Sequence, residues 1–573
     1  MKRVLIANRG EIAIRIARAA RDCGMTSIGI HAEADSTALY LRHMDEVWSL
    51  GPGRPAETWL NIDRIINIAK RAGADAVHPG YGFLSERAEF ARAVQDAGMI
   101  WIGPAPEVIE LLGSKIAARR IAAQVGAPLV RGSDGALADS NAAIAFTREV
   151  GLPVAIKAAH GGGGRGMKVA WHLDEVAELY DSAVREAMEA FGRGECYAEQ
   201  FLDKPRHVEA QIMADSHGNT LVLGTRDCSL QRRNQKLVEE APAPFLTEDQ
   251  RRQIHEAARA ICAEVGYTGA GTVEFLVSRS GVISFLEVNT RLQVEHPVTE
   301  ETTGLDIVVE QFRIAMGLPL LMTETPAPRG HALEFRINAE DPGRGFLPAP
   351  GRISDFRPPS GPGIRLDSGV EAGSVVPPIY DSMMAKLIVW GPDRPTALAR
   401  ARRALAEFEI SGVASVLPFH RAVLDEPAFT TDTGFSVHTN WIETEFSGVA
   451  PAPRTDAAEE ASLIRTFVEI DGKRHSLGLP ADLFAALGTQ SAEVTGDSPP
   501  QHDRNILTSP SHGVLQRQLV EEGANVSEGE TVAILEAMKM EARIVATRAG
   551  RLHWLTSPGE TLSAGSTIAR VDS

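Results

Sequence analysis

A repeat close to the C-terminus is the strongest constraint on how this chain folds. Four residues recur at a constant offset of 36: Gly523, Ser527, Gly529 and Thr531 return as Gly559, Ser563, Gly565 and Thr567, and apolar Val526 and Val532 return as Leu562 and Ile568. Each copy alternates turn residues with short β-branched stretches. One such unit cannot bury its apolar face alone, so we expect the two copies to pack together as a small all-β barrel or sandwich over residues 505–573.

A lysine lies between the two copies. The segment Glu536–Ala542 reads Glu-Ala-Met-Lys-Met-Glu-Ala, which places Lys539 in the connection between two expected strands. Taken by itself, the motif favours a solvated lysine at a hairpin tip, because short motifs match often by chance. The surrounding repeat weighs against that interpretation and makes Lys539 a candidate functional residue.

The rest of the chain requires several more domains. At about 150 residues per domain, 573 residues predict roughly four. Strand-like Val4–Ala7 is followed by alanines and isoleucines at helical spacing, which is typical of a doubly wound α/β sheet. Proline-rich stretches near residues 451 and 499 predict linkers around a small β segment with an Asp471-Gly472 turn. The expected boundaries are 1–112, 113–330, 331–445, 446–504 and 505–573.

The composition excludes several classes of protein. Acidic residues outnumber basic ones by 75 to 58, for a net charge of −17, which argues against binding nucleic acid or acidic membranes through a global positive field. No apolar run is long enough to span a membrane, and the four cysteines lack the spacing of metal ligands. We therefore expect a soluble, cytoplasmic protein.

A glycine run follows a strand-like segment. Pro153–Ala159, which contains Lys157, leads directly into His160–Gly166, and the run includes Gly162, Gly163 and Gly164. Glycines expose backbone N–H groups and can approach phosphate oxygens closely. A flexible surface loop is an equally good explanation of the run alone. The pattern matches neither a Walker A sequence nor a GxGxxG fingerprint.

Carboxylates and an amide form a third group of candidates. Glu274 lies in one strand-like segment, and Glu287 and Asn289 lie on one face of another, since residues i and i+2 of a strand point the same way. These oxygen donors suit Mg²⁺ that carries nucleotide phosphates, although strand-end carboxylates are often merely exposed. Arg291 and Glu295 follow closely, and an anion held by arginine beside a glutamate forms a workable acid–base site.

Together these motifs resemble the biotin-dependent carboxylases. Residues 1–440 are similar to the ATP-grasp enzyme biotin carboxylase in NRGEIA, HPGYGFLSE, IKAAHGGGGRGM, PRHVEAQ, RDCSLQRRNQK, EEAP, GAGTVEF and EVNTRLQVEHPVTE. The tail, with AMKM inside its repeat, resembles a biotinyl domain, whereas lipoyl domains usually have Asp or Glu before their lysine. The resemblance implies a Rossmann-like N-terminal domain, an ATP-grasp domain with a mobile lid, a β-rich C-terminal domain and a small all-β biotinyl domain.

The resemblance also implies roles for individual residues. Lys539 would carry covalent biotin, and Mg²⁺ or Mn²⁺ would lie on Glu274, Glu287 and Asn289. ATP would contact Lys115, Lys157, Gly162, Gly163, Gly164, Glu199, Leu202, His207 and Gln231. Bicarbonate would lie on Lys236, Arg291, Gln293 and Val294, with Glu295 as the base that takes its proton. Arg336 would stabilise the enolate-like biotin, in a pocket that includes Tyr81, Gly82 and Phe83.

The predicted function is the ATP- and bicarbonate-dependent carboxylation of biotin, as in the α subunit of an acetyl- or propionyl-CoA-type carboxylase. No segment remains for a carboxyltransferase, so the expected partners are a separate carboxyltransferase (β) subunit, for which residues 466–490 are a candidate docking segment, and biotin protein ligase. We also expect a homo-oligomer within a larger complex. The alternatives are the ATP-binding subunit of a two-subunit pyruvate carboxylase, another ATP-grasp ligase, which leaves AMKM unexplained, or a simple carrier, which leaves the carboxylate cluster unexplained.

Overall fold

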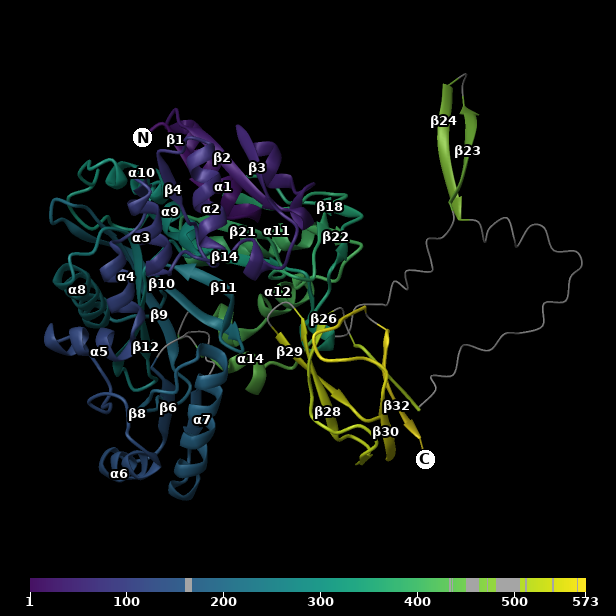
Figure 1. Ribbon diagram of the computed structural model, residues 1–573. Helices are drawn as coiled ribbons and strands as arrows, with labels where there is room; N and C mark the ends of the chain where they lie inside the picture. Colours follow the sequence, from purple (N-terminus) through teal and green to yellow (C-terminus); the bar gives the residue numbers. More distant parts are fainter. Residues whose placement is uncertain are drawn as a thin grey trace, which may run out of the picture. The chain divides into compact units, whose positions relative to one another are not determined.

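The computed structural model describes residues 1–159, 167–431, 434, 436–449, 463–470, 473–480, 505–510, 513–537, 540–563 and 565–572. The chain divides into two compact units. The first comprises residues 1–342 and 350–449, and the second comprises residues 450–573 together with 343–349. Figure 1 labels many of the helices and strands of both units.

The first unit begins with a parallel sheet of the doubly wound type that the sequence predicts. Its strand order is β3-β2-β1-β4-β5. The strands are β1 Arg3–Ile6, β2 Thr26–Ala32, β3 Glu46–Gly51, β4 Ala76–His78 and β5 Ile100–Trp101, and the helices are α1 Gly10–Asp22, α2 Ile62–Arg71 and α3 Ala88–Asp96. Val4 and Ile6 pack in the core that contains α1, whereas Leu5 and Ala7 pack in the core that contains α2 and α3. The period-two alternation of β1 therefore sends successive side chains to opposite faces of a covered sheet.

An antiparallel sheet of eight strands forms the centre of the same unit. The order is β13-β12-β9-β10-β11-β14-β21-β19. Its strands are β9 Arg206–Ala214, β10 Thr220–Arg232, β11 Gln235–Ala241, β12 Gly269–Val277, β13 Ile283–Asn289, β14 His331–Asn338, β19 Ile364–Ser368 and β21 Met383–Gly391. The strands that follow residue 330 thus extend the sheet formed by the strands before it. Helices α8 Glu248–Glu264, α9 His296–Thr303 and α10 Ile307–Ala315 pack against this sheet.

A two-residue turn sets the register between β10 and β11. Arg232 pairs with Gln235, and the intervening Arg233 and Asn234 have φ values of 48° and 61°. Two successive positive φ angles define the tight type I′ turn, whose twist matches that of the flanking strands. This turn places Lys236 at the start of β11, next to the residues of β9 and β10 that surround it in the site.

A smaller sheet precedes the central one in sequence. Its order is β7-β6-β8, with β6 Val154–Ala158, β7 Met167–Ala170 and β8 Cys196–Gln200, and helices α6 Ser140–Val150 and α7 Val176–Phe191 are packed against it. The predicted glycine run between β6 and β7, including Gly162, Gly163 and Gly164, lies outside the described residues. Helices α4 Pro106–Gly113 and α5 Lys115–Gln124 connect the parallel sheet to this region, and the Ser114 hydroxyl caps α5 by accepting the N–H of Ala117.

The remaining α-helices and strands before residue 450 lie between residues 340 and 444. They are α11 Arg394–Glu407, α12 Leu417–Val423, α13 Pro427–Thr430, α14 Trp441–Thr444, β15 Glu340–Asp341, β16 Leu347–Pro348, β17 Gly351–Arg352, β18 Asp355–Arg357, β20 Val375–Val376 and β22 Glu409–Ser411. In the second unit, β23 Leu463–Ile470 and β24 Lys473–Pro480 pair antiparallel on either side of the predicted Asp471-Gly472 turn, whose two residues lie outside the described ranges.

Across the described ranges, no helix combines the length and the apolar character that a membrane span needs.

The C-terminal repeat forms two four-stranded sheets that share one core. The orders are β25-β32-β30-β27 and β29-β28-β26-β31. The strands are β25 Ile506–Thr508, β26 Gly513–Gln518, β27 Asn525–Val526, β28 Thr531–Ala537, β29 Met540–Val545, β30 Gly550–Trp554, β31 Thr561–Leu562 and β32 Thr567–Asp572.

The two copies of the repeat exchange strands. Strand β27 of the first copy pairs with β30, and β31 of the second copy pairs with β26. The repeated apolar pairs Val526/Leu562 and Val532/Ile568 all lie in the common core. The predicted packing of the two copies against each other is therefore confirmed.

The shared core should determine the stability of this repeat. Leu535 of β28 is fully buried, whereas Val545 of the neighbouring β29 is 44% exposed. Leu535→Ala should therefore lower the local free energy of unfolding by about 2–5 kcal/mol, because it leaves a cavity. Hydrogen exchange followed by mass spectrometry on the full-length chain should show faster exchange in peptides from 525–537. Val545→Ala, the control, should change this exchange little, and equal effects of the two variants would contradict the shared core.

Candidate active site

The centre of the site is Glu295, a buried carboxylate held by two cations. It precedes α9, and its side chain is 2% exposed. Lys236 Nζ lies 2.6 Å from Oε1, and the Arg336 guanidinium lies 2.9 Å from Oε2. Burial alone would raise the pKa of Glu295, but the nearby cations, first Lys236 and then Arg336, hold that pKa well below its ordinary value. Glu295 is therefore ionised at neutral pH.

A row of charged side chains crosses four neighbouring strands beside Glu295. Glu287 of β13 lies directly opposite Glu274 of β12, Glu274 lies opposite Glu209 of β9, and Glu209 lies opposite Arg226 of β10. Like charges placed opposite each other destabilise a sheet. Three aligned carboxylates therefore need cations, and the row creates a strong site for them.

Lys236 supplies one of these cations. Its Nζ lies 2.6 Å from Glu209 Oε2 and 3.0 Å from Glu274 Oε1, in addition to its contact with Glu295. Burial alone would lower the pKa of Lys236, but the surrounding acidic groups hold it well above its ordinary value. One ammonium group therefore connects the carboxylate row to the predicted base.

Arg226 supplies the second cation. Its side chain is completely buried, forms an ion pair with Glu209, and donates to Gln293 Oε1 at 2.9 Å. Gln293 in turn donates to Glu274 Oε1 at 2.9 Å. The sequence motifs contain Arg226 and Glu209, but no role is predicted for either. The signal for Glu209 is the alternation of polar residues on β9, where His207, Glu209 and Gln211 recur at period two.

The predicted metal ligands gather at the outer end of the carboxylate row. Asn289 lies two residues beyond Glu287 on the same strand and donates through Nδ2 to Glu274 Oε1 at 2.9 Å. Lys115 Nζ lies 3.4 Å from Glu287 Oε2, and His207 Nε2 lies 2.9 Å from Glu274 Oε2. Two facing carboxylates and an amide are hard oxygen donors, and a divalent cation would relieve their mutual repulsion. This donor set fits Mg²⁺ or Mn²⁺.

The predicted bicarbonate residues border the same cluster. Arg291 donates to Asn289 Oδ1 at 3.0 Å and pairs with Glu86 at 2.9 Å. The Val294 carbonyl oxygen accepts a hydrogen bond of 2.8 Å from Lys386. With Lys236 and Gln293, these residues surround Glu295 with cationic and amide groups, which suits a small oxyanion.

The predicted nucleotide residues come from two sheets. Glu199 of β8 forms ion pairs with Lys157 of β6 and with Arg119 of α5. Burial raises the pKa of Glu199, but Lys157 and Arg119 outweigh burial and lower it. In the central sheet, Gln231 Nε2 lies 3.3 Å from His207 Nδ1. Leu202, the other residue predicted near adenine, follows β8 in the connection that leads to β9.

The predicted biotin pocket lies in the turn that follows β4. Gly82 and Phe83 have φ values of 70° and 45°, so this turn is held in the left-handed region. The Phe83 ring stacks on Trp59 with a centroid separation of 5.2 Å, and the Tyr81 hydroxyl donates to Glu11. Ligands of doubly wound folds bind outside the carboxyl ends of the parallel strands, where this turn is located.

Lys539 lies outside the described residues. The described residues nearest to it, Ala537 and Met540, are paired with each other at the end of the β28–β29 hairpin. The two strands predicted on either side of Lys539 are therefore confirmed.

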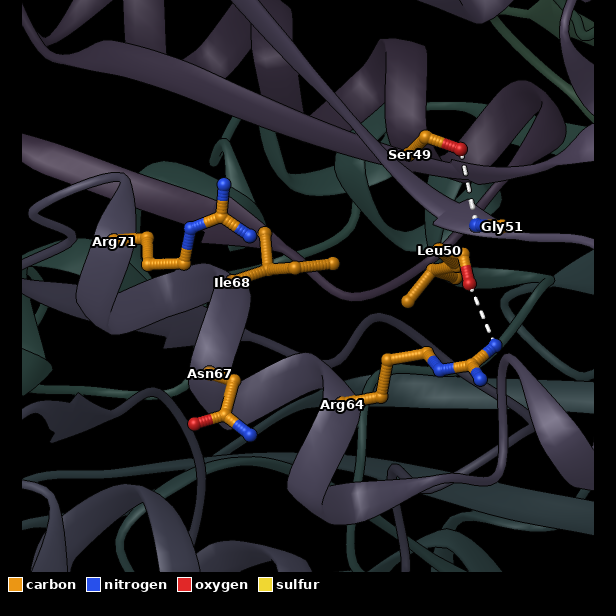
Figure 2. Close-up of a pocket in the computed structure, with 7 residues that line it drawn as sticks. All are labelled: Ser49, Leu50, Gly51, Arg64, Asn67, Ile68 and Arg71. Atoms are coloured by element: carbon orange, nitrogen blue, oxygen red, sulfur yellow. Dashed lines mark hydrogen bonds between the residues drawn. The ribbon is translucent and has the colours of Figure 1, made fainter.

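An open pocket elsewhere contains none of the predicted site residues. It has a volume of about 540 Å³ and is lined by residues of the edge strand β3 and of α2, including Arg64 and Arg71 (Figure 2). Arg64 donates to the Leu50 carbonyl oxygen at 2.7 Å, and the Gly51 N–H donates to the Ser49 hydroxyl at 3.0 Å (Figure 2). These bonds satisfy backbone groups of an edge strand, which disfavours pairing with another strand.

Four family descriptions match the chain in succession. They are the N-terminal domain of biotin carboxylase at residues 1–109, the ATP-binding domain of the carbamoyl-phosphate synthase L chain at 114–323, the C-terminal domain of biotin carboxylase at 334–444, and the biotin-requiring enzymes at 505–571. The domain boundaries drawn from the sequence stay predictions.

Individual relatives cover from 77% to 99% of this chain. The biotin-dependent acyl-coenzyme A carboxylase alpha3 subunit of Mycobacterium leprae is 54% identical, over 99% of this chain and 98% of its own. A pyruvate carboxylase subunit of Methanothermobacter thermautotrophicus is 43% identical, over 85% and 98%. The biotin carboxylase domain dimer of 2-oxoglutarate carboxylase from Hydrogenobacter thermophilus, solved with MgADP, ADP and bicarbonate, is 44% identical with a TM-score of 0.74, over 77% and 97%.

The chain belongs to the family of ATP-dependent biotin carboxylases that carry a biotinyl domain, as the acyl-coenzyme A carboxylase alpha subunits do. The predicted fold class, enzyme class and biotin carboxylase function are thereby confirmed, as are the predicted cofactors biotin, ATP and Mg²⁺. The lower identity to the pyruvate carboxylase relative does not favour that alternative.

A second pair of buried carboxylates lies behind Arg336. Glu239 of β11 accepts a hydrogen bond of 2.6 Å from Arg336, and it lies opposite Glu334 of β14. Burial raises the pKa of Glu239 to about 7. The positive charge of Arg336 opposes this rise, and the negative charge of Glu295 adds to it. Neither carboxylate oxygen of Glu334 has a hydrogen-bond partner among the described residues, and burial raises its pKa as well. These two glutamates were not predicted from the sequence.

The raised pKa of Glu239 predicts how stability depends on pH. Above the ordinary pKa of 4.5, the folded chain binds this proton more tightly than the unfolded chain does, so stability falls as the pH rises from about 4.5 through about 7. Glu239→Gln should therefore flatten the decline of the urea midpoint between about pH 5 and pH 8.

Asp45→Asn provides the control. Hydrogen bonds from the Ser27 N–H and hydroxyl lower the pKa of Asp45, so its contribution is lost only as the pH falls below about 3.8. This variant should shift the urea midpoint by a constant amount between pH 5 and pH 8. The same slope in Glu239→Gln and the unsubstituted chain would contradict the assignment.

Proposed function

We propose that this chain transfers a carboxyl group from bicarbonate to biotin carried on Lys539, with the hydrolysis of ATP. The observation that carries the proposal is the position of Glu295: an ionised base held between Lys236 and Arg336, beside a row of carboxylates that suits a metal–nucleotide complex. A carrier module would need none of these groups.

The first half of the reaction activates bicarbonate. Bicarbonate is a poor electrophile, so phosphorylation by ATP makes a reactive carboxyphosphate. Arg291 and Gln293 bind and orient the anion. The anion takes the place of one of the two cations, Lys236 or Arg336, that contact Glu295. Glu295 then takes the bicarbonate proton, and Lys236 stabilises the negative charge that develops during phosphoryl transfer.

The nucleotide residues position ATP for this step. Lys115, Lys157 and His207 are proposed to contact its phosphates, with Gln231 at the ribose and Glu199 and Leu202 near the adenine. Magnesium, held by Glu274, Glu287 and Asn289, would neutralise phosphate charge during the transfer. The solved relative that contains MgADP supports the binding of a magnesium–nucleotide complex by this fold.

The second half of the reaction takes place beside Arg336. Carboxyphosphate would break down to CO₂ and phosphate. Biotin, when attached, would supply the nitrogen that accepts the CO₂ and gives up its proton to the phosphate. The Arg336 guanidinium would stabilise negative charge on the biotin ring, and the turn containing Tyr81, Gly82 and Phe83 would hold the ring and exclude water. Attachment to Lys539 through a linker raises the local concentration of biotin at this site.

Transfer of the carboxyl group to its final acceptor requires another protein. Full-length similarity to an acyl-coenzyme A carboxylase alpha subunit implies a separate carboxyltransferase partner. We propose that this partner is a β subunit specific for acetyl-CoA or propionyl-CoA, that biotin protein ligase modifies Lys539, and that the chain forms a homo-oligomer, as its dimeric relative does. The β23–β24 hairpin is a candidate docking element for the partner.

The proposed base has a direct test. Glu295→Gln keeps the size of the side chain but cannot accept the proton, so bicarbonate-dependent ADP release should fall by about 10²–10⁴-fold. The matched control is Glu301→Gln on the following helix α9, where the carboxylate pairs with Arg365. Glu301→Gln should keep its rate, whereas retention of the full rate in Glu295→Gln would refute the assignment.

A further inference from the structure

A buried lysine connects the two halves of the site. Lys386 of β21 is completely buried, and its Nζ donates to the Val294 carbonyl oxygen at 2.8 Å and lies 3.2 Å from Glu11 Oε1. A buried ammonium group is costly unless it is paired and hydrogen-bonded. The contacts with the Val294 carbonyl oxygen and with Glu11 therefore stabilise the buried ammonium group. Both contacts lead to the site.

The first contact leads to the proposed base. Val294 directly precedes Glu295, so the bond to the Val294 carbonyl fixes the peptide plane from which Glu295 emerges. Lys386 also lies opposite Arg336 across β14 and β21, which places the two cations side by side on one face of the sheet.

The second contact leads to the biotin turn. Glu11 lies in the first turn of α1, its side chain is 2% exposed, and it accepts the hydroxyl of Tyr81. Lys386, Glu11 and Tyr81 therefore form a continuous chain of contacts from the Val294–Glu295 peptide to the proposed biotin pocket.

Other acidic groups near Lys386 do not explain its position. Asp367, which lies opposite Lys386 on β19, is already paired with Arg365 at 2.9 Å. Glu334 has no hydrogen-bond partner among the described residues, although it approaches the same face. Glu11 is thus the carboxylate that Lys386 contacts, and Glu11 connects it to Tyr81.

We propose that Lys386 is a positioning residue that couples the bicarbonate site to the biotin pocket through Glu11 and Tyr81. The inference rests on the proposed function. Lys386 touches neither substrate: it holds the base on one side and the hydroxyl of the pocket tyrosine on the other. Loss of this connection should weaken the use of both bicarbonate and biotin, while the ATP residues on β6, β8 and α5 keep their contacts.

A second connection joins the same two segments on the surface. Glu86, shortly after the biotin turn, pairs with Arg291, but 42% of the Glu86 side chain is exposed. Solvent weakens such a pair. The Glu86–Arg291 pair still joins the two segments when the Lys386 connection is broken, so we expect only moderate fold-changes from the variants below.

The test compares hydroxyl deletions in two buried tyrosines of the full-length chain. All variants carry Lys539→Ala, so that added free biotin is the sole acceptor, and ADP release is measured against bicarbonate, biotin and ATP. Tyr81→Phe removes only the hydroxyl that bonds Glu11, and it should raise the KM for bicarbonate by about 5-fold, although Tyr81 is not a bicarbonate residue. Tyr40→Phe, whose hydroxyl donates to the Ile30 carbonyl oxygen at 2.9 Å, is the matched control and should leave this KM unchanged.

A second variant breaks the connection at its centre. Lys386→Met with Glu11→Gln removes both charges together, so no lone charge is left buried. It should raise the KM for bicarbonate and for biotin by about 10-fold while changing the KM for ATP by less than about 2-fold. Lys386→Arg with Glu11 intact should restore part of the loss.

The outcomes separate the two proposals. If the parent chain releases no ADP in response to bicarbonate and biotin, the proposed function fails, and the role of Lys386 fails with it. If the parent is active but Tyr81→Phe keeps its KM for bicarbonate, or if the Lys386 variant loses ATP affinity equally, Lys386 is a structural residue only and the coupling is refuted.

Discussion

The repulsion among three aligned carboxylates is the constraint on which the rest of the site depends. Glu287, Glu274 and Glu209 occupy directly opposed positions on three neighbouring strands. Such a row cannot stay ionised in a buried sheet without cations, and the chain supplies Arg226 at its inner end, Lys236 beside it and Lys115 at its outer end. A metal ion bound with ATP would add the charge that the outer pair still lacks.

The continuity of the central sheet explains why the catalytic groups converge. Strands β9 to β13 carry the carboxylates, whereas β14 and β21, which follow residue 330, carry Arg336 and Lys386. Because all these strands belong to one sheet, the cations of the later strands lie against the anions of the earlier ones. The base, Glu295, receives one cation from each part: Lys236 from β11 and Arg336 from β14.

The spacing of residues along the chain predicted the features that depend on neighbouring residues: which strands are covered on both faces and which side chains share a face. The alternation in Val4–Ala7 indicated a strand covered on both faces, and the spacing of Glu287 and Asn289 placed them on one face. The equivalent positions Val532 and Ile568 indicated the shared core of the repeat. The roles of the site residues came from the resemblance to biotin carboxylase.

Long-range register could not be predicted in this way. Glu209 and Glu274 are far apart in the sequence, and only the pairing of β9 with β12 places them opposite each other. Glu11 and Lys386 meet only because α1 lies near β21. Neither residue has a local pattern that distinguishes it from an ordinary surface charge, so burial and partner appear only in the folded chain.

The most direct measurement is the transfer of ¹⁴C from labelled bicarbonate to the biotinylated full-length chain. With ATP and Mg²⁺ present, the account predicts acid-labile label on the chain, which disappears when ATP is omitted or when Lys539 is replaced by alanine. A biotinylated chain that hydrolyses ATP but acquires no label would contradict the account. Equal label on the Lys539→Ala chain would contradict it as well.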